Sequence, residues 1–144
     1  MIILSKCGIN NVSIHKGALI IRKIGAFNQK VLSVLDEDIP LGTPIYIGTV
    51  NIEHIKNRHP YEYDKYFKDI EYIIDKPDYV GKNPKDNSII LVKEYKTNDE
   101  FIRVGVKVSS RGQYFARTMH LLSNCNAVKY IEKGNLKKLD ILCE

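Results

Sequence analysis

The sequence lacks the features that mark membrane, secreted and fibrous proteins. No apolar run approaches the roughly 18–20 residues that span a bilayer. The first residues contain neither a basic stretch nor an apolar stretch long enough for a signal peptide. No residue type forms a tract, and 44% of the residues are hydrophobic, which excludes disorder, collagen and coiled coil. We therefore expect a protein that is soluble and made in the cytoplasm.

Cysteine is scarce, and several common enzyme motifs are missing. Three cysteines that are far apart and form no CxxC pair give neither a disulfide framework nor a zinc knuckle. There is no HExxH, no Gly-x-Ser-x-Gly elbow, and the basic loop at 81–85 has too few glycines for a phosphate-binding P-loop. His, Asp and Glu do not cluster at ligand spacing, so we expect no metal and no cofactor.

The order of apolar patterns predicts one α+β domain over residues 1–144. That length suits a single domain, and no linker or internal repeat divides it. The predicted segments are short strands within 2–5 and 13–24, a helix at 28–36, a strand at 45–47, helices at 50–59 and 63–75, and strands at 88–95, 101–109, 113–122 and 127–131. We therefore expect N-terminal helices packed on a C-terminal antiparallel β-meander of three to five strands.

The helix at 50–59 carries two candidate catalytic histidines. His54 and Arg58 are four residues apart and share a helix face. A neighbouring guanidinium disfavours a protonated imidazole, which leaves His54 suited to act as a base. His59 falls with isoleucines near the helix end, where a core histidine is at least as good an interpretation as a catalytic one. Two further histidines lie in strand-like stretches and are expected to be structural: His15 and His120.

Positive charge is concentrated in the last third of the chain. The formal net charge is +5, and the stretch 101–123 contains no acidic residue. Such a stretch is typical of a polyanion-binding surface, although a solvated face with acids on neighbouring strands has the same composition. Arg103, Lys107 and Arg111 are predicted to form one patch that faces the helix at 50–59. Tyrosines are frequent between 61 and 79, and Tyr66 is a candidate for stacking on a base, against the alternative of a half-buried helix residue.

The chain resembles the phage-associated nuclease families of the barnase/EndoU/colicin/RelE-like (BECR) fold. The resemblance covers about 23–122, and we interpret 1–22 as an N-terminal extension of the same domain. Its strength lies in the order and spacing of several short stretches together. They are Thr43-Pro44-Ile45-Tyr46-Ile47-Gly48, Asn51-Ile52-Glu53-His54-Ile55, Arg58-His59-Pro60, Tyr63 to Tyr66, Ile73 to Gly81, Asn83-Pro84 and Tyr114-Phe115-Ala116-Arg117-Thr118.

The resemblance implies a metal-independent ribonuclease or a relative of toxin domains, encoded in a phage or mobile element. It assigns catalytic positions to His54, His59, Arg117 and Thr118, and a basic position to Lys107. The RNA 2′-hydroxyl would be the nucleophile, and the product a 2′,3′-cyclic phosphate. Expected partners are RNA, tRNA among others, and a cognate inhibitor or immunity protein, without a membrane. The residues expected to bind RNA are Arg58, Tyr66, Lys82, Arg103 and Arg111.

Adjacent strand residues point to opposite faces, so Arg117 and Thr118 can serve one site only at a strand end or bulge. Arg117 alternates with Phe115 and Met119, which makes it the better candidate for a structural role. Two other functions fit the same residues. One is a non-catalytic module that binds nucleic acid or protein, with salt-sensitive binding and no turnover. The other is an ADP-ribosyltransferase-type enzyme, which the late strands do not favour because they contain no recognisable catalytic Glu motif.

Overall fold

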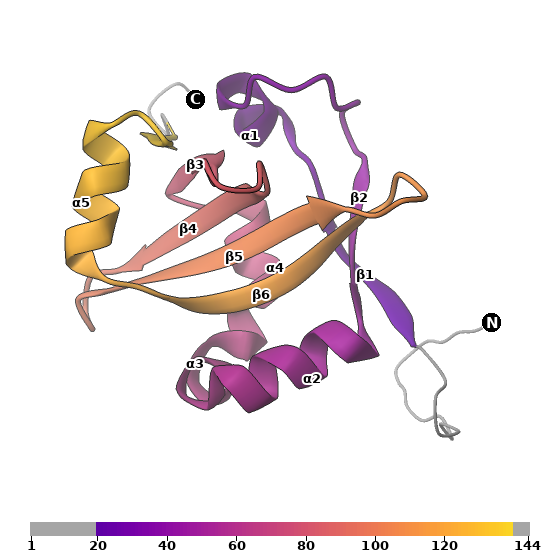
Figure 1. Cartoon of the computed structure of the whole chain (residues 1–144), viewed down its shortest axis with the longest axis horizontal. Coiled ribbons are helices and arrows are strands. Elements are labelled where there is room, and N and C mark those ends of the chain that lie inside the picture. The colour runs from indigo at the N-terminus through magenta and orange to yellow at the C-terminus, as the bar shows by residue number, and fades with distance from the viewer. Residues whose placement is uncertain (1–19, 140–144) are drawn as a thin grey trace.

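A seven-stranded sheet forms the centre of the structure, a computed structural model that describes residues 20–139 (Figure 1). The strand order is β1-β2-β6-β5-β4-β3-β7. Every neighbouring pair is antiparallel except β2 and β6, which are parallel. The strands are β1 (Ile21–Ala26), β2 (Pro44–Gly48), β3 (Tyr79–Lys82), β4 (Ile89–Tyr95), β5 (Glu100–Val108), β6 (Tyr114–Leu122) and β7 (Leu136–Lys138).

Helices cover both faces of the sheet and one edge of β6. In Figure 1, α4 passes behind the sheet, α2 and α3 lie below β6, and α5 stands at the left. The helices are α1 (Gln29–Val34), α2 (Thr49–Arg58), α3 (Pro60–Tyr66), α4 (Ile70–Asp75) and α5 (Asn124–Glu132), with a 3-10 turn at Phe67–Asp69. Between residues 20 and 139, no helix has the length and apolar character needed to cross a membrane.

Alternation along β5 divides the sheet into two faces. Ile102, Val104 and Val106 join the main core, together with Ile73 and Ile74 of α4. Fully burying each of these side chains contributes about 1.5–3 kcal/mol. The opposite face, here called the α5 face, is covered by α5 only at one end. That covered end is a second apolar cluster of Ile90, Val92, Leu122, Ala127 and Leu136. The other side chains of this face are therefore free to serve a site.

The α+β class is confirmed, but the sheet is larger than the predicted meander. The described residues form seven strands instead of three to five, and β2 adds a parallel pairing beside β6. Helices do not all precede the strands, because α5 follows β6. The predicted strand at 2–5, residues 13–19, and Cys7, His15 and Cys143 lie outside the described residues.

Two predicted elements differ in type or boundary. The segment 127–131 is helical, because the Ser123 side chain caps α5 by accepting a hydrogen bond from the Asn126 N–H at 3.1 Å. Ala127 then packs against the sheet. The helix predicted at 63–75 begins earlier, at Pro60, since proline suits the first helical position, and the 3-10 turn interrupts it.

Candidate active site

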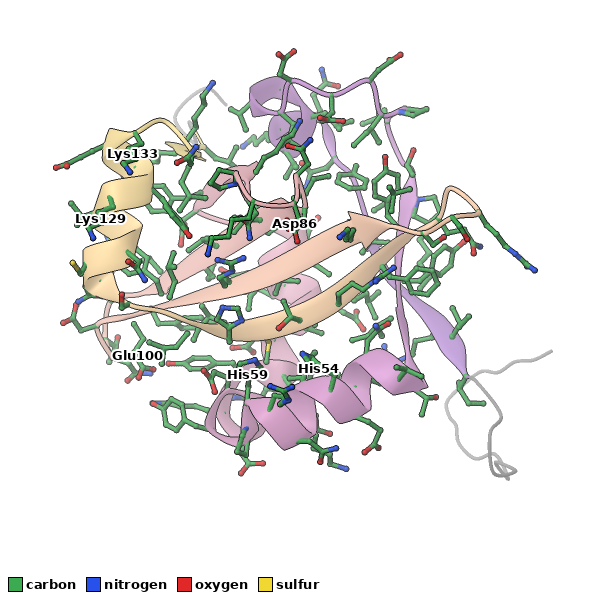
Figure 2. The ribbon with its side chains drawn as sticks, in the orientation of Figure 1. His54, His59, Asp86, Glu100, Lys129 and Lys133 are labelled. Carbon is green, nitrogen blue, oxygen red and sulfur yellow. The ribbon has the colours of Figure 1, made fainter. Side chains whose placement is uncertain are left out.

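Three imidazoles meet where α2 and α3 run beside β6. The rings of His59 and His120 are stacked, with centroids 4.8 Å apart and an interplanar angle of 25°. The His54 ring stands edge-on to His59 at a centroid distance of 6.1 Å. In Figure 2, His54 and His59 lie next to each other between α2 and β6. We call these three residues the histidine cluster.

His59 is fixed at the corner between α2 and α3. Its backbone N–H donates to the Ile55 carbonyl at 2.8 Å, and its carbonyl accepts from the Tyr63 N–H at 2.9 Å. Its φ of −135° and ψ of 60° leave the helical region, because Pro60 disfavours the helical conformation in the residue before it. Ile55 is 0% exposed, so the core anchors α2 one residue after His54.

The strands β5 and β6 present His120 on the α5 face. His120 is the cross-strand partner of Arg103, and Thr118 is the partner of Gly105. The Thr118 Oγ1 lies 3.4 Å from the His120 Nδ1. The register shifts after Gly105 and leaves Arg117 as an extra residue on β6. This bulge keeps Thr118 on the α5 face, leaves Arg117 exposed, and breaks the alternation that sequence analysis assumed.

His120 is uncharged at neutral pH. Burial lowers its pKa from 6.5 to about 4, and the positive charge of Arg103 and the neighbouring His59 and His54 act in the same direction. The Glu62 carboxylate opposes the shift. That carboxylate also accepts a hydrogen bond from the Leu121 N–H at 2.9 Å. Glu62 therefore joins α3 to the edge of β6 next to the histidine cluster.

Two of the predicted basic residues share the α5 face with His120. Arg103 and Lys107 are four residues apart on β5, which corresponds to roughly 13 Å along the strand. Lys107 is exposed, and its Nζ lies 3.8 Å from the Asp86 Oδ2. Arg103 is only 8% exposed. Arg111 lies farther along, exposed in the turn between β5 and β6.

The other predicted RNA-binding residues are dispersed. Arg58 is exposed in the last turn of α2, four residues after His54. Lys82 lies on β3 and forms an ion pair with Glu37. Tyr66 is 2% exposed and donates a hydrogen bond from its hydroxyl to Glu100, so its ring is part of the core. The structure therefore leaves Lys82 and Tyr66 outside the surroundings of the histidine cluster.

His120 is the member of the cluster for which sequence analysis assigned a structural role only. The signal available in the sequence is its spacing from Thr118, because residues two apart on a strand share a face. A candidate site at Thr118 therefore extends to His120. The contact with His59, which is 61 positions earlier, has no counterpart in local spacing.

This arrangement suits proton transfer beside an anionic group. A neutral imidazole accepts a proton, an imidazolium donates one, and adjacent imidazoles can take the two roles in one reaction. A guanidinium and an ammonium on the same face supply positive charge. Among residues 20–139, no group of three or more His, Cys, Asp or Glu side chains is arranged to hold a metal ion.

Comparison with known proteins identifies the family of the chain. Residues 22–129 match the model of the family described as phage-Barnase-EndoU-ColicinE5/D-RelE like nuclease3. No curated protein and no solved structure matches the chain. The matched segment begins in β1 and ends within α5, so it includes every residue of the histidine cluster.

Proposed function

Because the chain belongs to the phage-Barnase-EndoU-ColicinE5/D-RelE like nuclease family, we propose that it is a metal-independent endoribonuclease. Its substrate is single-stranded RNA, with tRNA as the preferred candidate, and its product carries a 2′,3′-cyclic phosphate. The observation that carries this proposal is the pair of imidazoles His54 and His59. His59 stacks on His120, which is the cross-strand partner of Arg103 and lies next to Thr118. Histidines are the side chains best suited to exchange protons with RNA near neutral pH.

The proposed reaction uses the RNA as its own nucleophile. His54 accepts the 2′-hydroxyl proton while the 2′-oxygen attacks phosphorus, and the bond from phosphorus to the 5′-oxygen breaks. His59 donates a proton to the leaving 5′-oxygen, so protons balance over the two histidines. DNA has no 2′-hydroxyl and is not cleaved. Lys107, Arg117 and Thr118 stabilise the charge that develops on the phosphate oxygens.

The basic residues outside this centre bind the RNA backbone in the proposal. Arg58 is exposed at the end of α2, and Arg111 is exposed in the turn between β5 and β6. Phosphate contacts of this kind add salt-sensitive affinity without reading sequence. As a toxin-type nuclease of a phage or mobile element, the protein acts in the cytoplasm of the cell whose RNA it cleaves. A cognate inhibitor protein protects the producing cell.

A variant pair tests the proposal. His54→Ala removes an exposed side chain and should lower the cleavage rate by roughly 10²–10⁴-fold while the unfolding transition is unchanged. Asn57→Ala, exposed on the same helix, is the matched control and should cleave at the wild-type rate. The assay follows cleavage of a labelled single-stranded RNA in EDTA. Salt-sensitive RNA binding without cleavage by the wild type would instead identify a non-catalytic binding module.

A further inference from the structure

Arg103 is a buried cation that forms no ion pair within the part of the chain that the structure describes. The residue is 8% exposed, and its Nε atom is buried without a hydrogen-bond partner. None of the ion pairs among residues 20–139 includes its guanidinium. Buried arginines are normally paired with a carboxylate or another anion, because desolvation of the charge is unfavourable. An arginine at this buried position therefore needs an explanation other than the stability of the folded chain.

The neighbours of Arg103 give no such reason. Its cross-strand partners are Val92 on β4 and His120 on β6, one apolar and the other uncharged at neutral pH. Even a buried ion pair can often be replaced with apolar side chains of similar volume without loss of stability, and a buried charge without a direct partner is less favourable than a pair. The guanidinium at this place is therefore a cost to the free protein.

The nearby carboxylates are engaged elsewhere. Glu62 accepts the Leu121 N–H. Asp86 accepts the N–H and the hydroxyl of Ser88 and faces Lys107 at 3.8 Å. In Figure 2, Asp86 lies above β5 while His54 and His59 lie below β6. The hydrogen bonds from Ser88 hold the pKa of Asp86 below its usual range, and the charges of Lys107 and Arg103 contribute less. Neither carboxylate forms an ion pair with Arg103.

On the β6 side of Arg103, the α5 face presents two side chains that can donate hydrogen bonds, Thr118 and His120. The Thr118 hydroxyl donates a hydrogen bond, and the imidazole of His120 donates one from either nitrogen according to its tautomer. Gly105 separates Arg103 from Lys107 on this face and contributes no side chain. A guanidinium, a hydroxyl and an imidazole together match an oxyanion that accepts several hydrogen bonds, and a guanidinium binds phosphate with two of its N–H groups at once.

We propose that Arg103, Thr118 and His120 form a binding site for one phosphate group, which would form the direct ion pair that the buried guanidinium does not make with the described residues. The natural occupant is a phosphate of the RNA backbone, an assignment that rests on the proposed function. Free inorganic phosphate has the same chemistry and binds as a competitor. The site makes His120 a positioning residue that holds the phosphate against His59, on which it stacks.

Phosphate binding at this site is coupled to proton uptake. The groups that face His120 are Arg103 from β5, His54 from α2, His59 from the corner between α2 and α3, and Glu62 from α3. Arg103 and the two histidines lower the His120 pKa, and an anion between Arg103 and His120 cancels part of that effect. The pKa of His120 therefore rises when the site is filled. By linkage, the anion binds more tightly as the pH falls.

The test measures anion binding without RNA cleavage. A fluorescent single-stranded DNA oligonucleotide reports backbone binding, because it has phosphates but no 2′-hydroxyl. Inorganic sulfate is the competing probe, since its charge does not change over the pH range used. The nuclear magnetic resonance signal of the His120 ring reports protonation. Wild-type protein should bind both probes, and the His120 signal should titrate at higher pH when sulfate is present.

Arg103→Met separates a binding role from a structural one. The variant keeps an unbranched side chain but removes the charge, so it should lose on the order of tenfold or more in affinity for both probes. Its thermal midpoint should equal or exceed that of the wild type. Arg103→Lys keeps the charge, loses the two-pronged guanidinium, and should bind with intermediate affinity. Arg22→Met, which removes an exposed arginine on β1 that pairs with Glu71, should bind as the wild type does.

Each outcome decides between defined alternatives. Unchanged affinity in Arg103→Met overturns the phosphate site, and so does a lower thermal midpoint that Arg103→Lys restores without restoring affinity. A DNA oligonucleotide that is displaced by sulfate only in variants retaining Arg103 supports it. If the wild type binds both probes but cleaves no RNA, the phosphate site is supported and the proposed ribonuclease activity is refuted. If Arg103→Met cleaves RNA at the wild-type rate, the phosphate site is refuted as part of the RNA-binding surface and the ribonuclease activity is supported.

Discussion

Replacing Glu62 with alanine should loosen the helices that carry His54 and His59 from the sheet. β2 pairs with β6 only at Tyr114 and Phe115, so among residues 20–139 no strand neighbours the rest of that β6 edge. The Glu62 carboxylate satisfies the Leu121 N–H on that edge at 2.9 Å. A hydrogen bond to a charged acceptor contributes about 1.5–3 kcal/mol. The alanine variant should therefore lose about 2 kcal/mol of unfolding free energy, or roughly 5–10 °C in thermal midpoint for a chain of this length.

Glu62→Gln separates the hydrogen bond from the charge. The amide oxygen still accepts the Leu121 N–H, so the loss should stay below about 1 kcal/mol. Both variants remove the negative charge that raises the His120 pKa, so in both that pKa should fall further. Urea denaturation measures the unfolding free energy, and the ring signals of His59 and His120 report whether their stack persists. Equal stability of the alanine and glutamine variants would refute this account of how α3 is held.

Three further predictions concern stability. The pKa of His120 is 6.5 in the unfolded chain and about 4 in the folded protein. The unfolded state therefore takes up the proton first as the pH drops between these values, and the unfolding free energy should fall by about 2 kcal/mol. His120→Phe should lessen that fall. In Gly81→Ala the new Cβ would overlap the Asn135 carbonyl, so β7 should detach and its amide hydrogens should exchange faster. Tyr66→Phe removes a hydroxyl that donates to Glu100 and accepts from Asn98, and equilibrium unfolding should show a loss of about 1–2 kcal/mol.

Local sequence pattern was sufficient to predict those helices and strands that carry a clear periodicity or a proline at their boundary. The strict alternation along β5 and the proline at position 60 gave the predicted strand and the end of α2 close to their observed positions. The short strands β3 and β7 were not predicted, because each has four residues or fewer and the two pair with each other across more than 50 residues of sequence. The segment 127–131 was predicted as a strand, and the Ser123 side chain, whose capping role was not considered, starts a helix there instead.

For the candidate site, the sequence predicted only which residues share one face of a single helix or strand. Helical spacing singled out His54 and His59, and strand spacing placed Arg103 and Lys107 together. The stack of His59 on His120 depends on how α2 docks against β6, which no local pattern contains. The burial of Arg103 likewise comes from tertiary packing, so sequence analysis treated it as a surface charge.

Analysis of the RNA ends is the most direct test of the central claim, which is cleavage through the 2′-hydroxyl with protons exchanged by His54 and His59. A single-stranded RNA with one 2′-deoxy nucleotide at a mapped cleavage site should be left intact at that bond, and its all-ribose counterpart should be cut. In EDTA, mass spectrometry should find a 2′,3′-cyclic phosphate on the upstream fragment and a free 5′-hydroxyl on the downstream one. Cleavage at the deoxy position, or a 5′-phosphate product, would contradict the account.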